Sequence, residues 1–176
     1  MQALMMNTQL MISSILRNAE NNFPDVEMVS VTADNPRHRQ TYSDFGKRCR
    51  RLANLLVSLN AEFGDRIGTL AWNDHRHMEL YYAVSGSGMV CHTINPRLFP
   101  EQISYIINHA GDKILFVDVL VMPLLEALKE HLTKVEKIVV LTNKENMPDS
   151  SFSNVLCYEE LLSNQSENYE WPEFDE

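Results

Sequence analysis

Short apolar runs alternate with amphipathic stretches along most of the chain. The runs are short enough for strands, and the stretches between them carry apolar residues at the spacing of one helix face. Continuous apolar strands separated by such helices are typical of a parallel sheet with helices on both faces and right-handed crossovers. The pattern therefore predicts an α/β fold. The predicted strands are 65–72, 89–94, 113–118 and 137–142, and the predicted helices between them are 73–86, 99–111 and 122–132.

The limits of these helices are marked by residues that begin or end helices. Asn73 or Asp74 can cap the first of them, because a short polar side chain accepts a hydrogen bond from the first turn. Pro100 lies in the first turn of the second helix, and Gly111 follows its end. We therefore expect helices that begin and end close to these positions.

The strongest helix pattern covers residues 41–64. Thr41 and Asp44 have the spacing of a capping box, with Asp in place of the usual Glu, and Gly64 stands where a glycine would end the helix. A stripe of apolar residues at helical spacing predicts one buried face. The stripe consists of Phe45, Cys49, Leu52, Leu56 and Leu59.

The chain before residue 41 predicts a helix followed by a short hairpin. Residues 1–18 are apolar and helix-like, and two Val-rich or polar runs meet at a turn at Asn35 and Pro36. The first helix is rich in methionine, which suits either an adaptable binding surface or, as we expect, packing against a neighbouring subunit or the chain's own core. The methionines are Met1, Met5, Met6 and Met11.

The chain after Lys144 contains no Lys or Arg and becomes acidic. Residues 157–162 can form one or two helical turns, and residues 163–176 are typical of a solvated linker. We therefore divide the chain into three parts. They are an N-terminal helix and hairpin (1–40), an α/β subdomain (41–145) and an acidic linker (146–176).

Composition places the chain among soluble globular proteins. It has 176 residues, of which 44% are hydrophobic and 22% charged, and this length supports one domain. A net charge of −9 argues against a nucleic-acid footprint over the whole domain. Cys49, Cys91 and Cys157 are odd in number and far apart, which suits a reducing compartment rather than a disulfide framework.

Targeting signals are not evident in the sequence. The first basic residue is Arg17, whereas a secretory signal has positive charge before its apolar stretch. No apolar run reaches the length of about 18 residues that a transmembrane helix needs. We expect a cytoplasmic protein, in which the glycosylation sequon at Asn164 has no role because glycosylation requires secretion.

Two polar clusters invite a catalytic interpretation that their order or spacing disfavours. Gly86 and Gly88 follow a predicted helix and precede a strand, whereas a phosphate loop has its glycines after a strand and before a helix. We expect a helix end with close backbone packing there. His75 and His77 are two apart and point to different faces of a helix, so we expect exposed polar residues rather than a metal site.

Two further segments leave alternatives open. The basic cluster at 47–51 predicts a solvated helix face, with contact to an anionic partner as the second interpretation. The strand at 89–94 is followed by Asn95, Pro96 and Arg97, at the sheet edge where ligands bind in open α/β folds. A structural turn is favoured there, and a ligand-facing role for Asn95 and Arg97 stays open.

The longest recognisable stretches are TYSDFGKRCRRLANLL (41–56), DRIGTLAWNDHRHMELYYAVSGSGMVCHTINPRLFPEQISYIINHAGDKILFVD (65–118) and MPLLEAL (122–128). Together they resemble the N-terminal region of bacterial medium- and long-chain fatty acyl-CoA synthetases. These enzymes belong to the AMP-forming adenylating superfamily, which also contains luciferase and peptide-synthetase adenylation domains. The resemblance covers nearly the whole chain, and HTINPRL (92–98) is specific to the fatty-acyl branch.

The resemblance implies ATP, Mg²⁺ and coenzyme A as the cofactors of the full-length enzyme and a fatty acid as its substrate. The family's catalytic motifs are a Ser/Thr/Gly-rich loop ending in Pro-Lys-Gly, a Tyr-Gly-x-Thr-Glu element, an adenosine-binding Asp and a lysine in a mobile C-terminal domain. None of them matches a residue here, so no catalytic residue is carried over. We expect a chain that stops before the phosphate-binding loop, needs no cofactor alone and is inactive alone. Such a chain is a deliberately shortened fragment, a truncated gene product or one part of a split protein.

The resemblance also implies where ligands and partners bind. In related enzymes the N-terminal region lies near the entry routes of coenzyme A and the acyl group, which makes His92, Asn95 and Arg97 candidates to face a substrate. The fatty-acyl branch exchanges N-terminal segments between subunits, so residues 1–40 predict a homodimer, and exposed apolar area predicts association in an isolated fragment. A non-catalytic interaction module is the alternative function. A small independent nucleotide-binding protein is disfavoured, because no glycine-rich turn leads from a strand into a helix.

Overall fold

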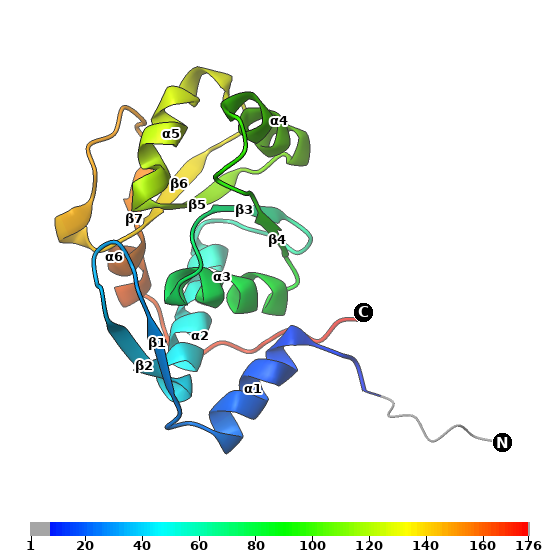
Figure 1. The fold of residues 1–176 in the computed structure, drawn as a ribbon. Helices are drawn as coiled ribbons and strands as arrows, with labels where there is room; N and C mark the ends of the chain where they lie inside the picture. Colours follow the sequence, from blue (N-terminus) through cyan, green and yellow to red (C-terminus); the bar gives the residue numbers. More distant parts are fainter. Residues whose placement is uncertain (1–7, 176) are drawn as a thin grey trace.

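A parallel sheet between two layers of helices forms the body of the molecule (Figure 1). The computed structural model describes residues 8–175. The predicted α/β class with helices on both faces is confirmed. The strands are β1 Glu27–Ser30, β2 His38–Thr41, β3 Arg66–Leu70, β4 Val90–Thr93, β5 Ile114–Asp118, β6 Lys137–Leu141 and β7 Val155–Cys157. The helices are α1 Ile12–Asn22, α2 Tyr42–Ser58, α3 His75–Gly86, α4 Pro100–Ala110, α5 Met122–Ala127 and α6 Tyr158–Ser163, with 3₁₀ turns η1 Val119–Val121, η2 Lys129–His131 and η3 Lys144–Asn146.

The order of the strands places a topological switch point in the middle of the sheet. The five parallel strands follow the order β4-β3-β5-β6-β7. From β3 the chain moves to β4 on one side and then returns to β5 on the other side. In doubly wound sheets, ligands bind outside the carboxyl ends of the strands, where the order reverses. The carboxyl edge of β3, β4 and β5 is therefore the place to search for a site.

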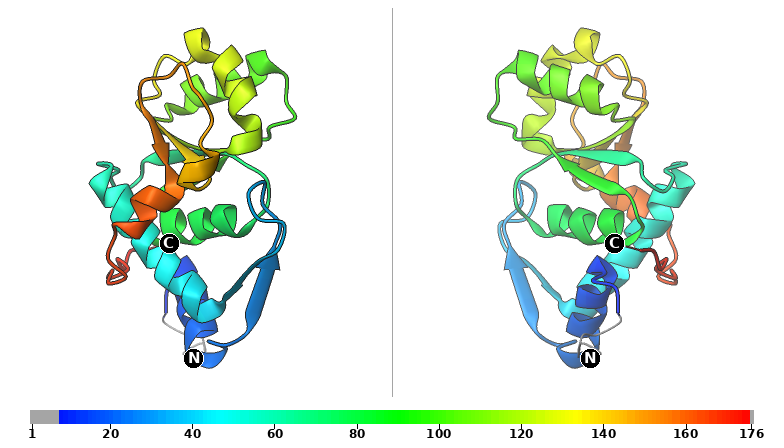
Figure 2. Two further views of the ribbon diagram at one scale, coloured as in Figure 1. Left: turned by 90° about the vertical axis from the view of Figure 1, so that its left-hand side faces the viewer. Right: turned by 90° about the vertical axis from the view of Figure 1, so that its right-hand side faces the viewer.

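The two faces of the sheet bury separate apolar clusters. Helices α2, α3 and α6 cover one face, and α4 and α5 cover the other (Figures 1 and 2). Every residue of β5 is buried, as expected for a central parallel strand. The first cluster contains Leu52, Leu55, Leu56, Leu80, Val84, Phe116, Val139 and Tyr158. The second contains Leu70, Ile103, Ile107, Leu115, Val117, Met122, Leu125 and Val140.

Most predicted helix limits agree with the structure. The side chains of Thr41 and Asp44 accept from each other's backbone N–H, so the capping box of α2 is confirmed, and its predicted apolar stripe is buried. Asp74 caps α3, Pro100 begins α4, and Gly111 ends α4 in the left-handed conformation. The predicted end of α2 at Gly64 is wrong. The helix ends at Ser58, and Asn60 (φ 62°), two residues further on, adopts the left-handed conformation that glycine usually takes after a helix.

The N-terminal part forms the predicted helix and hairpin. Strands β1 and β2 pair in antiparallel register, separate from the main sheet, and α1 packs against α2 and α3. Met11 is buried on its own chain, whereas Met1, Met5 and Met6 lie outside the described residues. Among residues 8–175, no helix is both long enough and apolar enough to cross a membrane.

The acidic part of the chain is more structured than its composition predicts. Residues 155–157 form β7, a fifth strand that the sequence pattern did not predict, and Tyr158 in α6 is fully buried. Residues 164–175 then run along α2 towards α1 (Figure 1). The predicted helical turns at 157–162 are therefore confirmed as α6, whereas residues 164–175, which we expected to be a solvated linker, make specific hydrogen bonds to α2.

Candidate functional site

A hollow lies at the carboxyl ends of β3 and β4, beside the switch point of the sheet. Its volume is about 500 Å³, and its walls come from residues 71–73 after β3 and 93–97 at the end of β4, with His77 of α3. The Asn95 side chain accepts a hydrogen bond from the backbone N–H of Arg97 at 2.9 Å, which fixes the turn after β4. The Arg97 guanidinium lies 5.3 Å from the centre of the Trp72 ring, within the range of a cation–π contact.

His77 forms the inner wall of the hollow. One ring nitrogen lies 2.9 Å from the hydroxyl of Thr69 and the other lies 3.1 Å from the carbonyl oxygen of Trp72. Burial lowers the pKa of His77, which outweighs the opposing effects of this carbonyl and of Asp74. The ring is therefore held neutral and fixed in orientation, so it shapes the hollow without adding charge.

Only two of the three predicted ligand-facing residues line this hollow. Asn95 and Arg97 do, whereas His92 lies earlier in β4 and faces Asp112. The His92 ring nitrogen is 2.8 Å from a carboxylate oxygen of Asp112, which is fully buried. Burial raises the pKa of Asp112, and the contact with His92 opposes that rise. His92 has a structural partner and is not part of the hollow.

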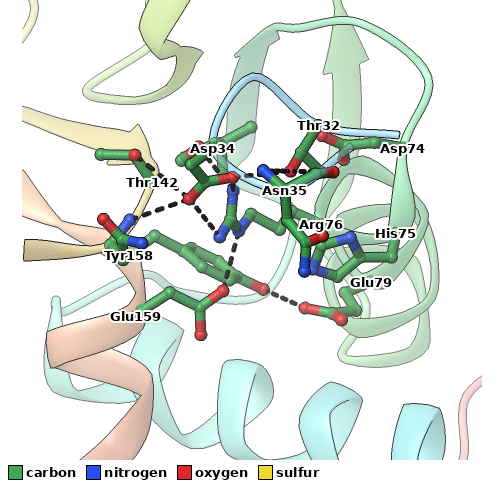
Figure 3. A network of polar contacts seen from close by, with 12 residues as sticks. Thr32, Asp34, Asn35, Asp74, His75, Arg76, Glu79, Thr142, Tyr158 and Glu159 are labelled. Carbon is green, nitrogen blue, oxygen red and sulfur yellow. Dashed lines mark hydrogen bonds and ion pairs between the residues drawn. The ribbon is translucent and has the colours of Figure 1, made fainter. Parts of the chain in front are cut away.

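The carboxyl edge of β6 and β7 carries a different arrangement, a buried network of ion pairs (Figure 3). Arg76 of α3 lies at its centre. Its guanidinium donates to the Asp34 carboxylate at 2.8 and 2.9 Å, to Glu159 at 2.8 Å and to the carbonyl oxygen of Leu141 at 3.1 Å. Asp34 comes from the loop of the hairpin β1–β2, so this network fastens the hairpin to the sheet.

The network continues through Arg48 of α2. Arg48 donates to both Glu79 and Glu159, and the Tyr158 hydroxyl donates to Glu79 at 2.6 Å. Burial raises the pKa of Glu79, against the opposing effects of Arg48 and Tyr158. Burial also acts to raise the pKa of Glu159, but Arg48 and Arg76 outweigh it and leave that pKa lowered. Each charge of the network therefore faces an opposite charge.

Two expectations about polar clusters are wrong because these side chains are used inside the fold. His75 and His77 are buried, not exposed: His75 stacks on His38 with ring centres 3.6 Å apart and contacts Ser30. They do face different partners, as their spacing predicts. The basic cluster at 47–51 is a solvated face only in part: Lys47 is exposed, whereas Arg48, Arg50 and Arg51 each pair with a carboxylate of this chain.

The glycine turn after α3 does not fit a nucleotide phosphate. Gly88 has a left-handed conformation (φ 78°), and a Cβ at this position would collide with the Phe63 ring. A Cβ at Gly86 would meet the Trp171 ring. The space next to both glycines is filled by aromatic side chains, so the predicted helix end with close packing is confirmed. Nor do residues 8–175 contain a group of three His, Cys, Asp or Glu side chains that could hold a metal ion.

The open hollow has polar groups that a ligand can reach, whereas the polar groups of the closed network are paired with one another. It presents a cation on an aromatic ring beside the polar atoms of Asn95 and Thr93, which are exposed. Such a surface can bind an anionic group or a flat ring. Sequence reasoning found Asn95 and Arg97 from their place after a strand. It missed Trp72 and His77, although the carboxyl end of the predicted strand 65–72 and the first turn of the helix that follows were the corresponding signal.

Comparison with known proteins assigns this chain to a family. Residues 16–173 match the model of the family described as AMP-binding enzyme. The chain is 43% identical over 172 residues to the 3-methylmercaptopropionyl-CoA ligase of Ruegeria lacuscaerulensis and 40% identical over 172 residues to the medium-chain-fatty-acid–CoA ligase of Ectopseudomonas oleovorans. Each alignment covers 98% of this chain and 32% of the relative. The chain therefore spans about a third of the length of the curated relatives it matches.

A solved structure agrees with this result at the level of the fold. The crystal structure of the anthranilate CoA ligase AuaEII in complex with anthranoyl-AMP matches with a TM-score of 0.76 at 20% identity. The match covers 98% of this chain and 30% of the ligase. The family match and the curated relatives confirm the resemblance to the N-terminal region of bacterial fatty acyl-CoA ligases that the sequence indicated. The chain belongs to the family of AMP-binding enzymes.

Proposed function

We propose that this chain is the N-terminal part of a fatty acid–CoA ligase. The observation that carries the proposal is the match of residues 16–173 to the family, together with 40% identity to a medium-chain-fatty-acid–CoA ligase over 98% of the chain. The complete reaction joins a fatty acid to coenzyme A in two steps. A carboxylate oxygen of the acid bonds to the α-phosphorus of ATP and pyrophosphate leaves. The thiol sulfur of coenzyme A then bonds to the acyl carbon, AMP leaves and the thiol proton is lost.

Within this reaction the chain supplies scaffold and one edge of a binding surface. The Gly86–Gly88 turn is packed with aromatic rings, and we assign ATP and Mg²⁺ to the part of the ligase outside this chain. The hollow with Asn95 and Arg97 is the surface that we assign to coenzyme A or to the acyl substrate at its entry. Arg97 would meet an anionic group there, because opposite charges attract and Trp72 holds the guanidinium in place. His92 supports β4 through Asp112. We expect the ligase to be cytoplasmic. We expect the isolated chain to have no ligase activity.

A chimera tests this proposal directly. The aligned segment of the medium-chain-fatty-acid–CoA ligase of Ectopseudomonas oleovorans is replaced by this chain, and thioester formation is measured with Mg-ATP, coenzyme A and fatty acids. We expect an active chimera and an inactive isolated chain. A matched variant carries Arg97→Gln, which should raise the KM for coenzyme A or for the acid with little change in protein stability. A folded chimera without activity, or an active isolated chain, would contradict the proposal.

A second function is favoured by the exposed apolar side chains near the N-terminus. Ile12 and Ile15 on α1 are 40% and 54% exposed, and Val29 and Val31 of the hairpin are 55% and 70% exposed. Exposed apolar side chains on α1 and on the hairpin are available for contact with a second copy of the chain. The chain can therefore act as a homodimerisation module that exchanges residues 1–40 with a second copy. Sedimentation of the isolated chain distinguishes this function, because a compact monomer at all concentrations contradicts it.

A further inference from the structure

Residues 164–175 form an acidic strap that is fastened along α2. The Asn54 side chain donates to the backbone carbonyl oxygens of Ser166 and Asn168, both at 2.9 Å. Arg50 donates to the carbonyl oxygen of Glu167 at 2.9 Å, and Arg51 pairs with its carboxylate at 2.7 Å. Three of these contacts are to backbone carbonyl oxygens. Helix α2 therefore fixes the backbone of the strap and also pairs with its carboxylate.

Aromatic side chains fix the far half of the same strap. The Trp171 ring packs on Gly86 at the end of α3, and Phe174 stacks edge-on against Phe63 with ring centres 5.5 Å apart. The Tyr169 hydroxyl donates to the Ser87 hydroxyl at 3.1 Å. The small residues at the end of α3 thus provide the surface on which the strap lies.

Helix α1 depends on its packing against α2 and α3. It has 11 residues, its N-cap makes no side-chain hydrogen bond, and helices of about this length are marginal in isolation. Glu20 reaches Arg50 with both carboxylate oxygens at 2.9 Å. A side chain at Gly46 would collide with the Glu20 carboxylate, so the glycine makes this ion pair possible.

The strap and α1 share their anchors. Arg50 binds Glu20 of α1 through one nitrogen and the strap through another. Trp171 packs against the small apolar cluster that Leu16 of α1 forms with Phe45 and Cys49 of α2. Gln9, just before α1, donates to Asp175 at 2.9 Å. Release of either segment therefore removes contacts that hold the other.

We propose that α1 and the acidic strap dock on α2 as one cooperative unit, so that the strap works as a clamp on the N-terminal helix. Thermodynamic linkage requires the effect to be reciprocal: a docked strap stabilises docked α1 by the same factor as α1 stabilises the strap. The clamp keeps the cluster around Leu16 closed. It also slows transfer of α1 to a second copy of the chain, because the shared contacts at Arg50 and Trp171 must break before they can form again in the other copy.

Hydrogen exchange measured by NMR on this chain tests the clamp. Trp171→Ala should speed the exchange of amides 16–22 in α1 by about tenfold or more, while amides of β5 and β6 keep their wild-type rates, because only a local opening is affected. Asn54→Ala is a milder variant, since its two lost hydrogen bonds both go to the strap. It should act in the same direction. Tyr105→Ala, at an exposed ring on α4, is the matched aromatic control and should change nothing in α1.

The reciprocal arm starts from α1. Glu20→Gln should move the indole N–H signal of Trp171 towards that of an exposed tryptophan, whereas Glu130→Gln at an exposed position should not. Released Trp171 with unchanged protection of α1 would overturn the proposal. So would a parallel increase of exchange in α1 and β5, which would make the strap part of global unfolding. Sedimentation of the same variants tests the exchange dimer separately and leaves the result on coupling unchanged.

Discussion

The two halves of one sheet edge use polar residues in opposite ways. At the carboxyl ends of β6 and β7, Arg76 and Arg48 are surrounded by carboxylates that come from the hairpin loop, α3 and α6. At the ends of β3 and β4, Arg97 is exposed and rests on the Trp72 ring above an open hollow. The first half has each buried charge paired, and the second presents its cation to solvent.

This difference separates structural from ligand-facing residues without any catalytic motif. A buried charge with several partners contributes to the position of the segments that it joins, and removal of one partner leaves the others uncompensated. An exposed cation on an aromatic ring contributes little to folding and is free to meet an anion. The proposals for the hollow depend on this contrast, so the experiments below change one residue on each side.

The largest effect is expected from Arg76→Met. The substitution leaves Asp34 and Glu159 without the guanidinium that contacts both, and loss of one partner from a buried ion pair costs about 3–5 kcal/mol. Urea unfolding followed by circular dichroism measures the change in the free energy of unfolding. The control is Arg39→Met, whose partner Glu27 is 45% exposed, and which should cost no more than about 1 kcal/mol. Equal losses of stability in the two variants would contradict the claim that the buried ion pairs of Arg76 matter more for folding than an exposed ion pair.

A smaller effect is expected in the dependence of stability on pH. Burial acts to raise the pKa of Asp34, but hydrogen bonds from Arg76 and Thr32 and the charge of Arg76 outweigh it and hold the pKa below its usual range. The unfolded chain therefore binds the proton first. The contribution of Asp34 to stability is complete above the unfolded pKa of about 3.9 and is lost as the pH falls through the folded pKa.

Urea unfolding between about pH 5 and 2.5 tests the direction of this change in stability. This range brackets the unfolded pKa of about 3.9. Wild type should lose more stability than Asp34→Asn, with a difference in slope of at most about 1.4 kcal/mol per pH unit. Comparison of the two proteins is needed because Glu79 and Asp118, whose pKa values burial raises, act in the opposite sense. Parallel curves would show that Asp34 is not the paired group that the structure indicates.

The smallest effect on stability is expected at the open half of the edge. Arg97→Gln removes one exposed cation–π contact, and such contacts contribute about 0.5–1 kcal/mol. The free energy of unfolding of the isolated chain should therefore fall by no more than this amount in the same urea experiment. A loss comparable to that of Arg76→Met would make Arg97 a structural residue and would weaken its assignment to a ligand.

The sequence predicted those features of the fold that depend on local pattern. The capping box at Thr41 and Asp44, the limits of α4 and the central strand β5 follow from residues close to one another in the chain. Strand β7 was missed because its three residues lie in a polar, acidic segment and are stabilised by pairing with β6. The end of α2 was misplaced because Asn60 can adopt the left-handed conformation that usually indicates glycine.

The closed network could not be predicted from the sequence because its partners are far apart in the chain. Arg76 lies 42 residues from Asp34 and 83 from Glu159, and nothing near Arg76 indicates a buried arginine. Asn95 and Arg97 were predicted because they follow a strand at the edge where ligands bind. His92 was predicted at the same site only because it lies close to Asn95 and Arg97 in the sequence. Side chains alternate between the two faces along a strand, and the side chain of His92 contacts Asp112 instead.

Isothermal titration of this chain with Mg-ATP, and separately with coenzyme A, tests the central claim most directly. The claim is that the chain supplies scaffold and an open substrate edge, while the nucleotide site belongs to the rest of the ligase. We expect no saturable heat with Mg-ATP, and any heat with coenzyme A should vanish in Arg97→Gln. Saturable binding of Mg-ATP by the isolated chain would contradict the account, because a phosphate site would then exist among residues that the structure shows packed against one another.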